Sequence, residues 1–172
     1  SKLTLEAPVV KDKSSILVSG RRTYFDLVAK GLNKINKKVP EIPYHFHDFN
    51  VKGNYRINDR HRIFLSGYFG RDVASYKLSD DNEQKTEWGN YTATIRYNYM
   101  ISNRLFANVT LLASNYNYLI DSKSTYGKKK KEQYFRWDAF LKDYSAKVDF
   151  SFFLNPTNSI KLYTTPSPSI WT

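Results

Sequence analysis

The chain has 172 residues, no cysteine and a formal net charge of +11, which excludes a disulfide scaffold, a thiolate metal site and a cysteine nucleophile. Aromatic residues make up 16% of it, with 14 Tyr and 11 Phe, and this richness favours strands. No stretch approaches the roughly 18 consecutive apolar residues of a transmembrane helix, so any contact with a bilayer would be made by strands. The first residues have no charged-then-apolar leader, so an exported protein would have lost its signal peptide or would be an internal piece.

Apolar and polar residues alternate with period two along most of the chain, which predicts strands. Seven segments alternate in this way and an eighth begins before the C-terminal tail. In chain order they are 2–9, 16–21, 48–57, 62–70, 92–101, 105–114 and 146–154, with the eighth starting at 160–162. The sequence therefore predicts an all-β protein with about eight strands in an antiparallel up-and-down meander.

The connections between these segments alternate in kind. Tight turns are expected at 11–14, 58–61, 102–104 and 155–158, and looser polar stretches at 29–43, 77–87 and 120–134. All short turns would then lie at one end of the sheet and all long loops at the other. This sorting is typical of an outer-membrane barrel, so we expect the meander to form part of a transmembrane β-barrel.

The polar faces of the strands carry charged and amide side chains that a dry core would not accept. Inside a water-filled or plugged barrel they are normal, and they are equally normal outside a soluble protein. The residues expected to face a lumen are Asn50, Lys52, Asn54, Arg56 and Arg96. Several strands exceed the usual five or six residues of globular sheets, which favours the barrel.

Aromatic residues gather towards both ends of the predicted strands, as in the aromatic girdles of membrane barrels. A tyrosine-rich soluble sheet is the alternative. The set near the tight turns is Tyr55, Tyr97, Tyr99, Phe150 and Phe152. The set near the loops is Tyr24, Phe25, Tyr44, Phe46, Trp88, Tyr91, Tyr116, Tyr118, Tyr134, Phe135 and Trp137.

Four stretches carry a family resemblance: DFNVKGNYRIND at 48–59, RIFLSGYFGRD at 62–72, SGRRTY at 19–24 and DYSAKVDF at 143–150. They resemble the barrel of TonB-dependent outer-membrane receptors of the Bacteroidetes type, and the similarity extends over roughly residues 3–162. The resemblance implies a barrel of about 22 strands around an N-terminal plug. It also implies uptake of a siderophore, cobalamin or glycan-type ligand with energy delivered by TonB.

The chain departs from that family in extent and in its ending. With about eight strands, the chain lacks the plug, the TonB-contacting segment and most of the barrel. Residues 1–163 are predicted to be the barrel segment and 164–172 an irregular tail, because Pro166 and Pro168 cannot donate to a ladder. A truncated or frame-disrupted gene product would have this pattern, so we expect a partial receptor in the cell outer membrane, with lipid as its partner.

Other candidate sites are weak. His45 and His47 share one face of an extended segment, but no third metal ligand accompanies them. The Lys128–Lys131 run is expected in a solvated loop that could meet lipopolysaccharide phosphates. No catalytic or phosphate-binding motif occurs. We therefore expect no enzyme activity, no catalytic, cofactor-binding or metal residues, no cofactor and no nucleic acid.

Two further hypotheses remain open at this stage. The first is a small outer-membrane barrel closed on itself, with a structural or adhesive role, which requires the first and last strands to pair. The second is a soluble basic β-protein that binds RNA or acidic glycans, for which the positive charge would serve.

Overall fold

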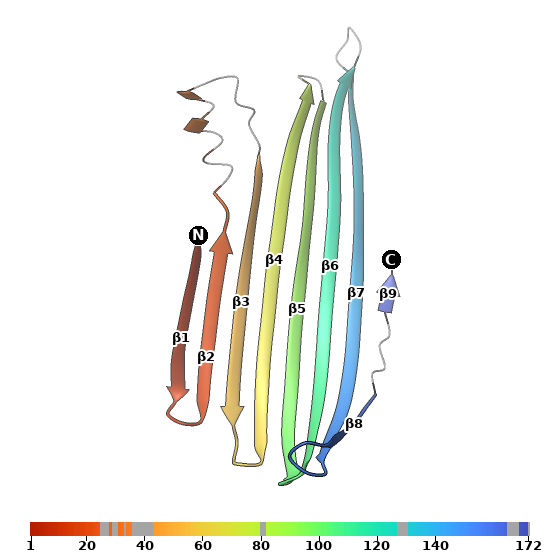
Figure 1. Cartoon of the computed structure of the whole chain (residues 1–172). Helices are drawn as coiled ribbons and strands as arrows, with labels where there is room; N and C mark the ends of the chain where they lie inside the picture. Colours follow the sequence, from red (N-terminus) through yellow and green to blue (C-terminus); the bar gives the residue numbers. More distant parts are fainter. Residues whose placement is uncertain are drawn as a thin grey trace.

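The strands form a single antiparallel sheet in which the first eight strands pair with their neighbours along the chain, whereas the short ninth strand pairs with the seventh (Figure 1). The computed structural model describes residues 1–24, 28, 31–32, 34–35, 43–79, 82–126, 131–164 and 169–171. The strands are β1 Lys2–Val10, β2 Ser14–Arg22, β3 Tyr44–Arg56, β4 His61–Ser79, β5 Asn82–Ser102, β6 Leu105–Tyr126, β7 Lys131–Phe153, β8 Ser159–Thr164 and β9 Ser169–Trp171. The predicted all-β up-and-down meander is confirmed, as an open sheet.

Among the described residues, no helix combines the length and the apolar character needed to cross a membrane.

Four tight turns join the strands at one end of the sheet, at the bottom of Figure 1. Asn58 and Asn155 start two of them, and their side-chain oxygens accept hydrogen bonds from backbone N–H groups two and three residues later. Asp12 occupies the left-handed region, with φ 59°, which Asp tolerates better than most residues. Polar turn residues thus fix the register of each hairpin.

The prediction of long loops is wrong for two of the three segments. The described residues of 77–87 and 120–134 all belong to strands: Lys77 pairs with Glu83, and Lys123 with both Glu83 and Tyr134. The strands β5, β6 and β7 reach 21, 22 and 23 residues, because pairing continues where both faces have become polar. The expected loop at 29–43 lies largely outside the described residues.

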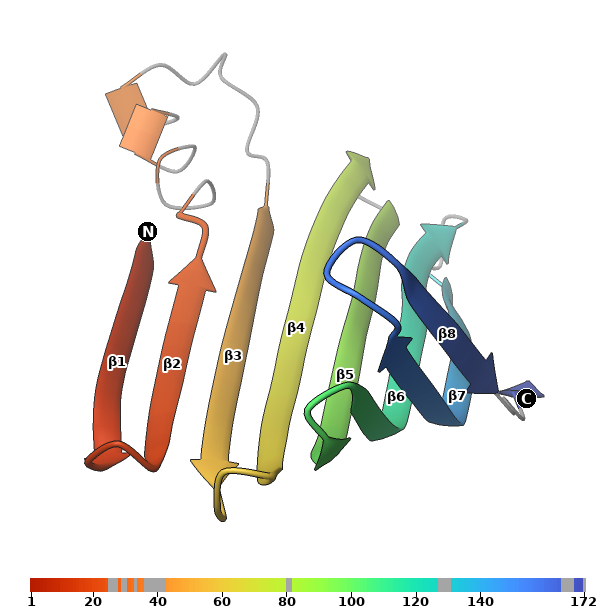
Figure 2. The same cartoon turned by 60° about the horizontal axis from the view of Figure 1, so that its bottom comes forward.

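The C-terminal strands are short. β8 pairs with β7 near the turn, and β9 returns to β7 further along, opposite Leu141–Asp143. Residues 169–171 of the tail are therefore strand, while 165–168, which include both prolines, lie outside the described residues. Figure 2 shows the β7–β8 hairpin curling forward from the plane of the sheet.

The sheet is one layer thick and has two free edges. Its order runs from β1 to β8 without a pairing between these two among the described strands. Ala74 and Ala107 are the only buried hydrophobic residues of the part described, whereas Leu5, Leu65 and Leu111 are 63%, 51% and 50% exposed. Because no described segment covers these leucines, this face of the sheet needs an apolar environment that the described residues do not supply.

Candidate functional site

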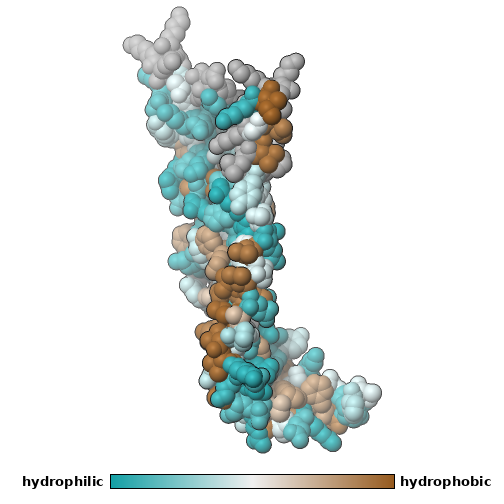
Figure 3. Space-filling view, turned by 90° about the vertical axis from the view of Figure 1, so that its left-hand side faces the viewer, coloured by the Kyte–Doolittle hydropathy of each residue, from teal (hydrophilic) through white to brown (hydrophobic). Residues whose placement is uncertain are grey.

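One face of the sheet carries a continuous apolar belt. Cross-strand pairing aligns Leu5, Val18, Val51 and Gly67 in one row. The next row of this face contains Leu65, Ile95, Leu111 and Ala146. On β5, β6 and β7 the belt covers 91–99, 105–113 and 144–152, about nine residues each, and crossing a bilayer takes roughly 9–11. Seen edge-on, hydrophobic atoms gather along the lower left margin of the sheet, with mainly hydrophilic atoms above them (Figure 3). We call this face the belt face.

Aromatic side chains border the belt on both sides. The turn-side set predicted from the sequence, Tyr55, Tyr97, Tyr99, Phe150 and Phe152, shares the belt face. His61 belongs to the same border, with its ring 4.4 Å from the ring of Tyr99. The opposite border is formed by Phe49, Phe69, Tyr91 and Tyr144, of which the sequence analysis had identified only Tyr91.

Most of the aromatics expected in the loop-side girdle lie on the other face, so that part of the prediction is wrong. The position of each residue along its strand decides which face its side chain occupies, because successive side chains alternate between faces. The aromatics that the pairing places opposite to the belt are Tyr44, Phe46, Trp88, Tyr116, Tyr118, Phe135 and Trp137. Phe25 lies outside the described residues. Within β5, counting from Tyr91 would have placed Trp88 on the opposite face, whereas the other strands require the cross-strand register.

Beyond the loop-side border, the belt face turns charged and its charges form pairs. Glu87 accepts from both Arg71 and Lys85, and these two cations lower the pKa of its carboxyl, Lys85 more than Arg71. The ammonium of Lys123 lies 2.7 Å from a carboxylate oxygen of Glu132. Above the belt, ion pairs thus replace the apolar side chains of this face, first at Glu87 and further along at Lys123 and Glu132.

The opposite face, which we call the polar face, carries hydrogen-bonded ladders at the height of the belt. Asn98 donates to Asn108 at 2.7 Å, and Asn108 donates to Asp149 at 2.9 Å, so one chain of bonds crosses β5, β6 and β7. One row away, Arg96 donates to Thr110 at 3.3 Å. Such polar groups need water or polar partners in the space that the polar face borders.

The five residues predicted to face a lumen all lie on the polar face. Pairing puts Asn50, Lys52 and Asn54 opposite Tyr68, Ser66 and Phe64, and Arg96 also opposite Phe64. Asn54 donates to the Ser15 hydroxyl at 2.6 Å, and the Arg56 guanidinium donates to the backbone carbonyl of Asp12 at 2.7 Å. The structure thus brings together the polar side chains that alternation alone had grouped.

Above the ladders, the polar face carries an aromatic shelf that the sequence analysis did not identify. The rings of Tyr44 and Trp88 stack at 6.3 Å, and those of Tyr118 and Trp137 meet edge-on at 5.7 Å. The Tyr44 hydroxyl donates to Asp72 at 2.7 Å, which raises the pKa of Tyr44 to about 12. Planar rings beside carboxylates are suited to bind polar solutes.

The remaining candidate residues gain little from the structure. His45 and His47 share the belt face, as predicted, and the described residues contain no group of three His, Asp or Glu able to hold a metal ion. Lys131 begins β7 opposite Tyr126, rather than lying in a loop, and Lys128–Lys130 lie outside the described residues.

No family model and no curated protein matches the chain. A functional assignment therefore rests on the geometry of the two faces.

The ladder on the polar face gives a first test. Asn108→Ala removes both of its side-chain hydrogen bonds and leaves Asp149 without its donor, which should lower the free energy of unfolding by about 1–3 kcal/mol. Urea unfolding followed by tyrosine fluorescence measures the change. Thr92→Ala, which removes only a 3.5 Å contact on the same face, is the control and should cost less than about 0.5 kcal/mol.

Proposed function

We propose that this chain is a segment of the wall of an outer-membrane transport barrel, a receptor of the TonB-dependent type. In this assignment the belt face meets lipid and the polar face lines the lumen. The chain would not act as an enzyme; it would contribute the surface along which a plug and a solute are held. The intact parent would take up a siderophore, cobalamin or glycan-type ligand.

The observation that carries this proposal is the height and the borders of the apolar belt. Counted with the aromatic rows at both ends, the belt is about nine residues high, which matches what a tilted transmembrane strand needs. The ion pair of Arg71 with Glu87 follows four residues beyond Tyr91 on β5. A soluble sheet would need a second protein layer on this face. Among the described residues nothing packs there, and Leu111 remains half exposed.

The free edges of the sheet favour the hypothesis that the chain is part of a larger barrel over the hypothesis of a small barrel closed on itself. Closure would require β1 to pair with β8, but these strands stand at opposite ends of the sheet order. Barrels avoid exposed edges by pairing every strand. Further strands of a larger barrel would complete β1 and the unpaired part of β7.

The absence of cysteine makes a site-directed spin-label experiment straightforward. Three leucines of β6 are replaced singly by cysteine in the full chain, labelled and reconstituted into phosphatidylcholine vesicles: Leu111 in the belt, Leu112 on the polar face and Leu119 above the belt. Pairing with Ile95, Thr94 and Glu87 fixes these three environments. Oxygen, which concentrates in lipid, and a water-soluble nickel chelate then serve as paramagnetic probes.

We expect the label at 111 to collide mainly with oxygen, and the labels at 112 and 119 mainly with the nickel chelate. If the label at 111 is shielded from both probes, protein covers the belt and the chain is a soluble β-protein. If 111 and 112 respond alike, the sheet does not separate lipid from water. Either result contradicts the proposal.

A further inference from the structure

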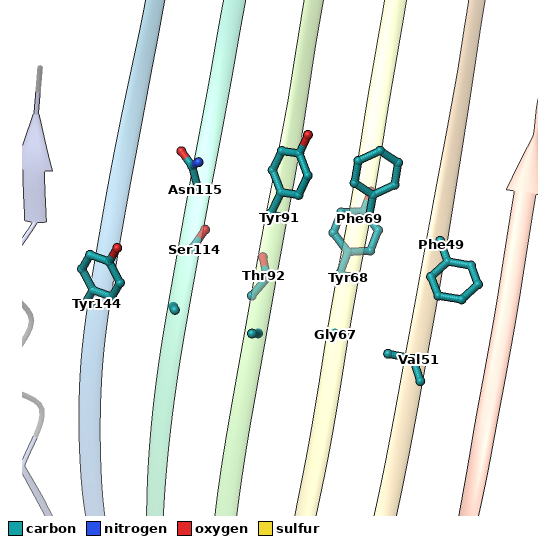
Figure 4. A pocket seen from close by; sticks show the side chains of 12 residues that line it. Phe49, Val51, Gly67, Tyr68, Phe69, Tyr91, Thr92, Ser114, Asn115 and Tyr144 are labelled. Atoms are coloured by element: carbon teal, nitrogen blue, oxygen red, sulfur yellow. The ribbon is translucent and has the colours of Figure 1, made fainter.

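The belt face is hollowed where small residues follow one another across three strands. Gly67 pairs with Ala93, Ala93 with Ala113, and Ala113 with Tyr144. A hollow of about 380 Å³ lies over this row, bordered by Phe69 and Tyr91. Figure 4 shows these rings on the loop side of Gly67, with Val51 next to the glycine on the neighbouring strand. Glycine and alanine thus leave an apolar depression directly below the loop-side aromatic border.

A second hollow continues the first towards the middle of the belt. It has about 470 Å³ and shares Ala93, Ala113 and Tyr144 with its neighbour, and its floor adds Ile95 and Ala146. The two together form a trough that starts at the border of the belt and runs into it. An acyl chain entering the belt from the membrane boundary has this course.

A cation stands at the upper end of the trough. Lys142 is two residues from Tyr144 on the same face and pairs with Asn115 across the strands. Other cations of this face are held by carboxylates, Arg71 and Lys85 by Glu87 and Lys123 by Glu132. Within the described part of the chain, Lys142 has no carboxylate partner, and its ammonium lies 5.1 Å from the centre of the Phe140 ring.

Asn115, beside Lys142, has an unused acceptor. Its Oδ1 is buried and accepts no hydrogen bond from the described residues, although the side chain lines the hollow. Buried acceptors of this kind are normally satisfied. A hydroxyl on a ligand headgroup would satisfy it, next to an ammonium that favours phosphate.

We propose that the trough binds an anionic membrane lipid whose headgroup carries a phosphate and a hydroxyl. One acyl chain lies over Gly67, Ala93 and Ala113, the phosphate contacts Lys142, and a headgroup hydroxyl donates to Asn115. This proposal rests on the proposed function, since it requires the belt to face lipid. Non-specific attraction to a lipid surface would require only a positive charge at any position. The proposed site instead combines one cation, one hydrogen-bond acceptor and one trough.

Electron paramagnetic resonance of spin-labelled lipids tests the site in phosphatidylcholine vesicles that contain the full chain. The fraction of motionally restricted label is compared for phosphatidylglycerol and phosphatidylcholine. We expect about a fivefold preference for phosphatidylglycerol, the factor that one lysine at a membrane surface provides. Lys142→Gln and Asn115→Leu should each reduce this preference, and Ala113→Leu should reduce it by filling the trough.

Lys147→Gln is the matched control. Lys147 lies on β7 with its ammonium over the ring of Tyr163 at 5.5 Å, but on the polar face, and its loss changes the net charge equally. The preference should survive this substitution. An equal loss in both lysine variants would show unspecific attraction by net charge and would overturn the site.

Other outcomes also decide. If an Ala113→Cys variant forms disulfide-linked dimers and no lipid preference is found, a second copy of the chain covers the trough. Absence of a preference in the wild type overturns the site directly. If the label at 111 reports lipid while no preference is found, the site fails and the barrel assignment stands. If no lipid label is restricted at all, both fail.

Discussion

Replacing Leu111 by arginine should lower the free energy of unfolding of the vesicle-inserted chain by about 2–4 kcal/mol, whereas the same change at the adjacent Leu112 should cost far less. Leu111 lies within the belt between Ile95 and Ala146, and Leu112 lies between Thr94 and Ser145 on the polar face. A guanidinium at position 111 must leave water for hydrocarbon, but at position 112 it stays among polar groups.

Urea titration of both variants in vesicles measures this difference. The two substitutions share residue type, strand and charge change, so they differ only in the face that receives the arginine. Equal destabilisation would contradict the assignment of lipid to the belt face. A larger loss at 112 would place the dry side of the sheet on the polar face.

The strand segments that form the belt are the part of the fold that could be predicted from the sequence. There, each strand has one apolar and one polar face, so Val51 and Ile95 stand out against neighbours such as Lys52 and Arg96. Asn58 and Asn155 marked the turns because their side chains cap the backbone locally. These signals are local, and a single sequence contains them in full.

The upper half of the sheet could not be predicted in the same way. Beyond the belt both faces are wet, and period-two alternation disappears although pairing continues. Lys123 and Glu132 read as loop residues, yet they form an ion pair between neighbouring strands. The aromatic shelf was missed for a related reason: Tyr44 and Trp88 are 44 positions apart and meet only through the register of β3, β4 and β5.

The second large effect is expected at Gly89, where the backbones of β4 and β5 approach closely. A Cβ at this position would stand 2.9 Å from the backbone oxygen of Gly70 and 3.7 Å from the Cα of Arg71. Backbone atoms within a paired sheet cannot yield without opening the ladder, so Gly89→Ala should lower the free energy of unfolding by about 1–3 kcal/mol. The strain falls beside Arg71 and Glu87, so the ion pairs above the belt should weaken with it.

Gly70→Ala is the control, because the obstacle there is of another kind. A Cβ at position 70 would meet the hydroxyl end of the Tyr68 side chain, which is 38% exposed and free to turn towards solvent. We expect a change within about 0.5 kcal/mol, measured by urea unfolding next to Gly89→Ala. The two glycines pair with neighbouring positions of the same hairpin, Gly70 with Asn90 and Gly89 with Arg71. A cost at 70 as large as at 89 would therefore show that the register of β4 and β5 differs from the one described.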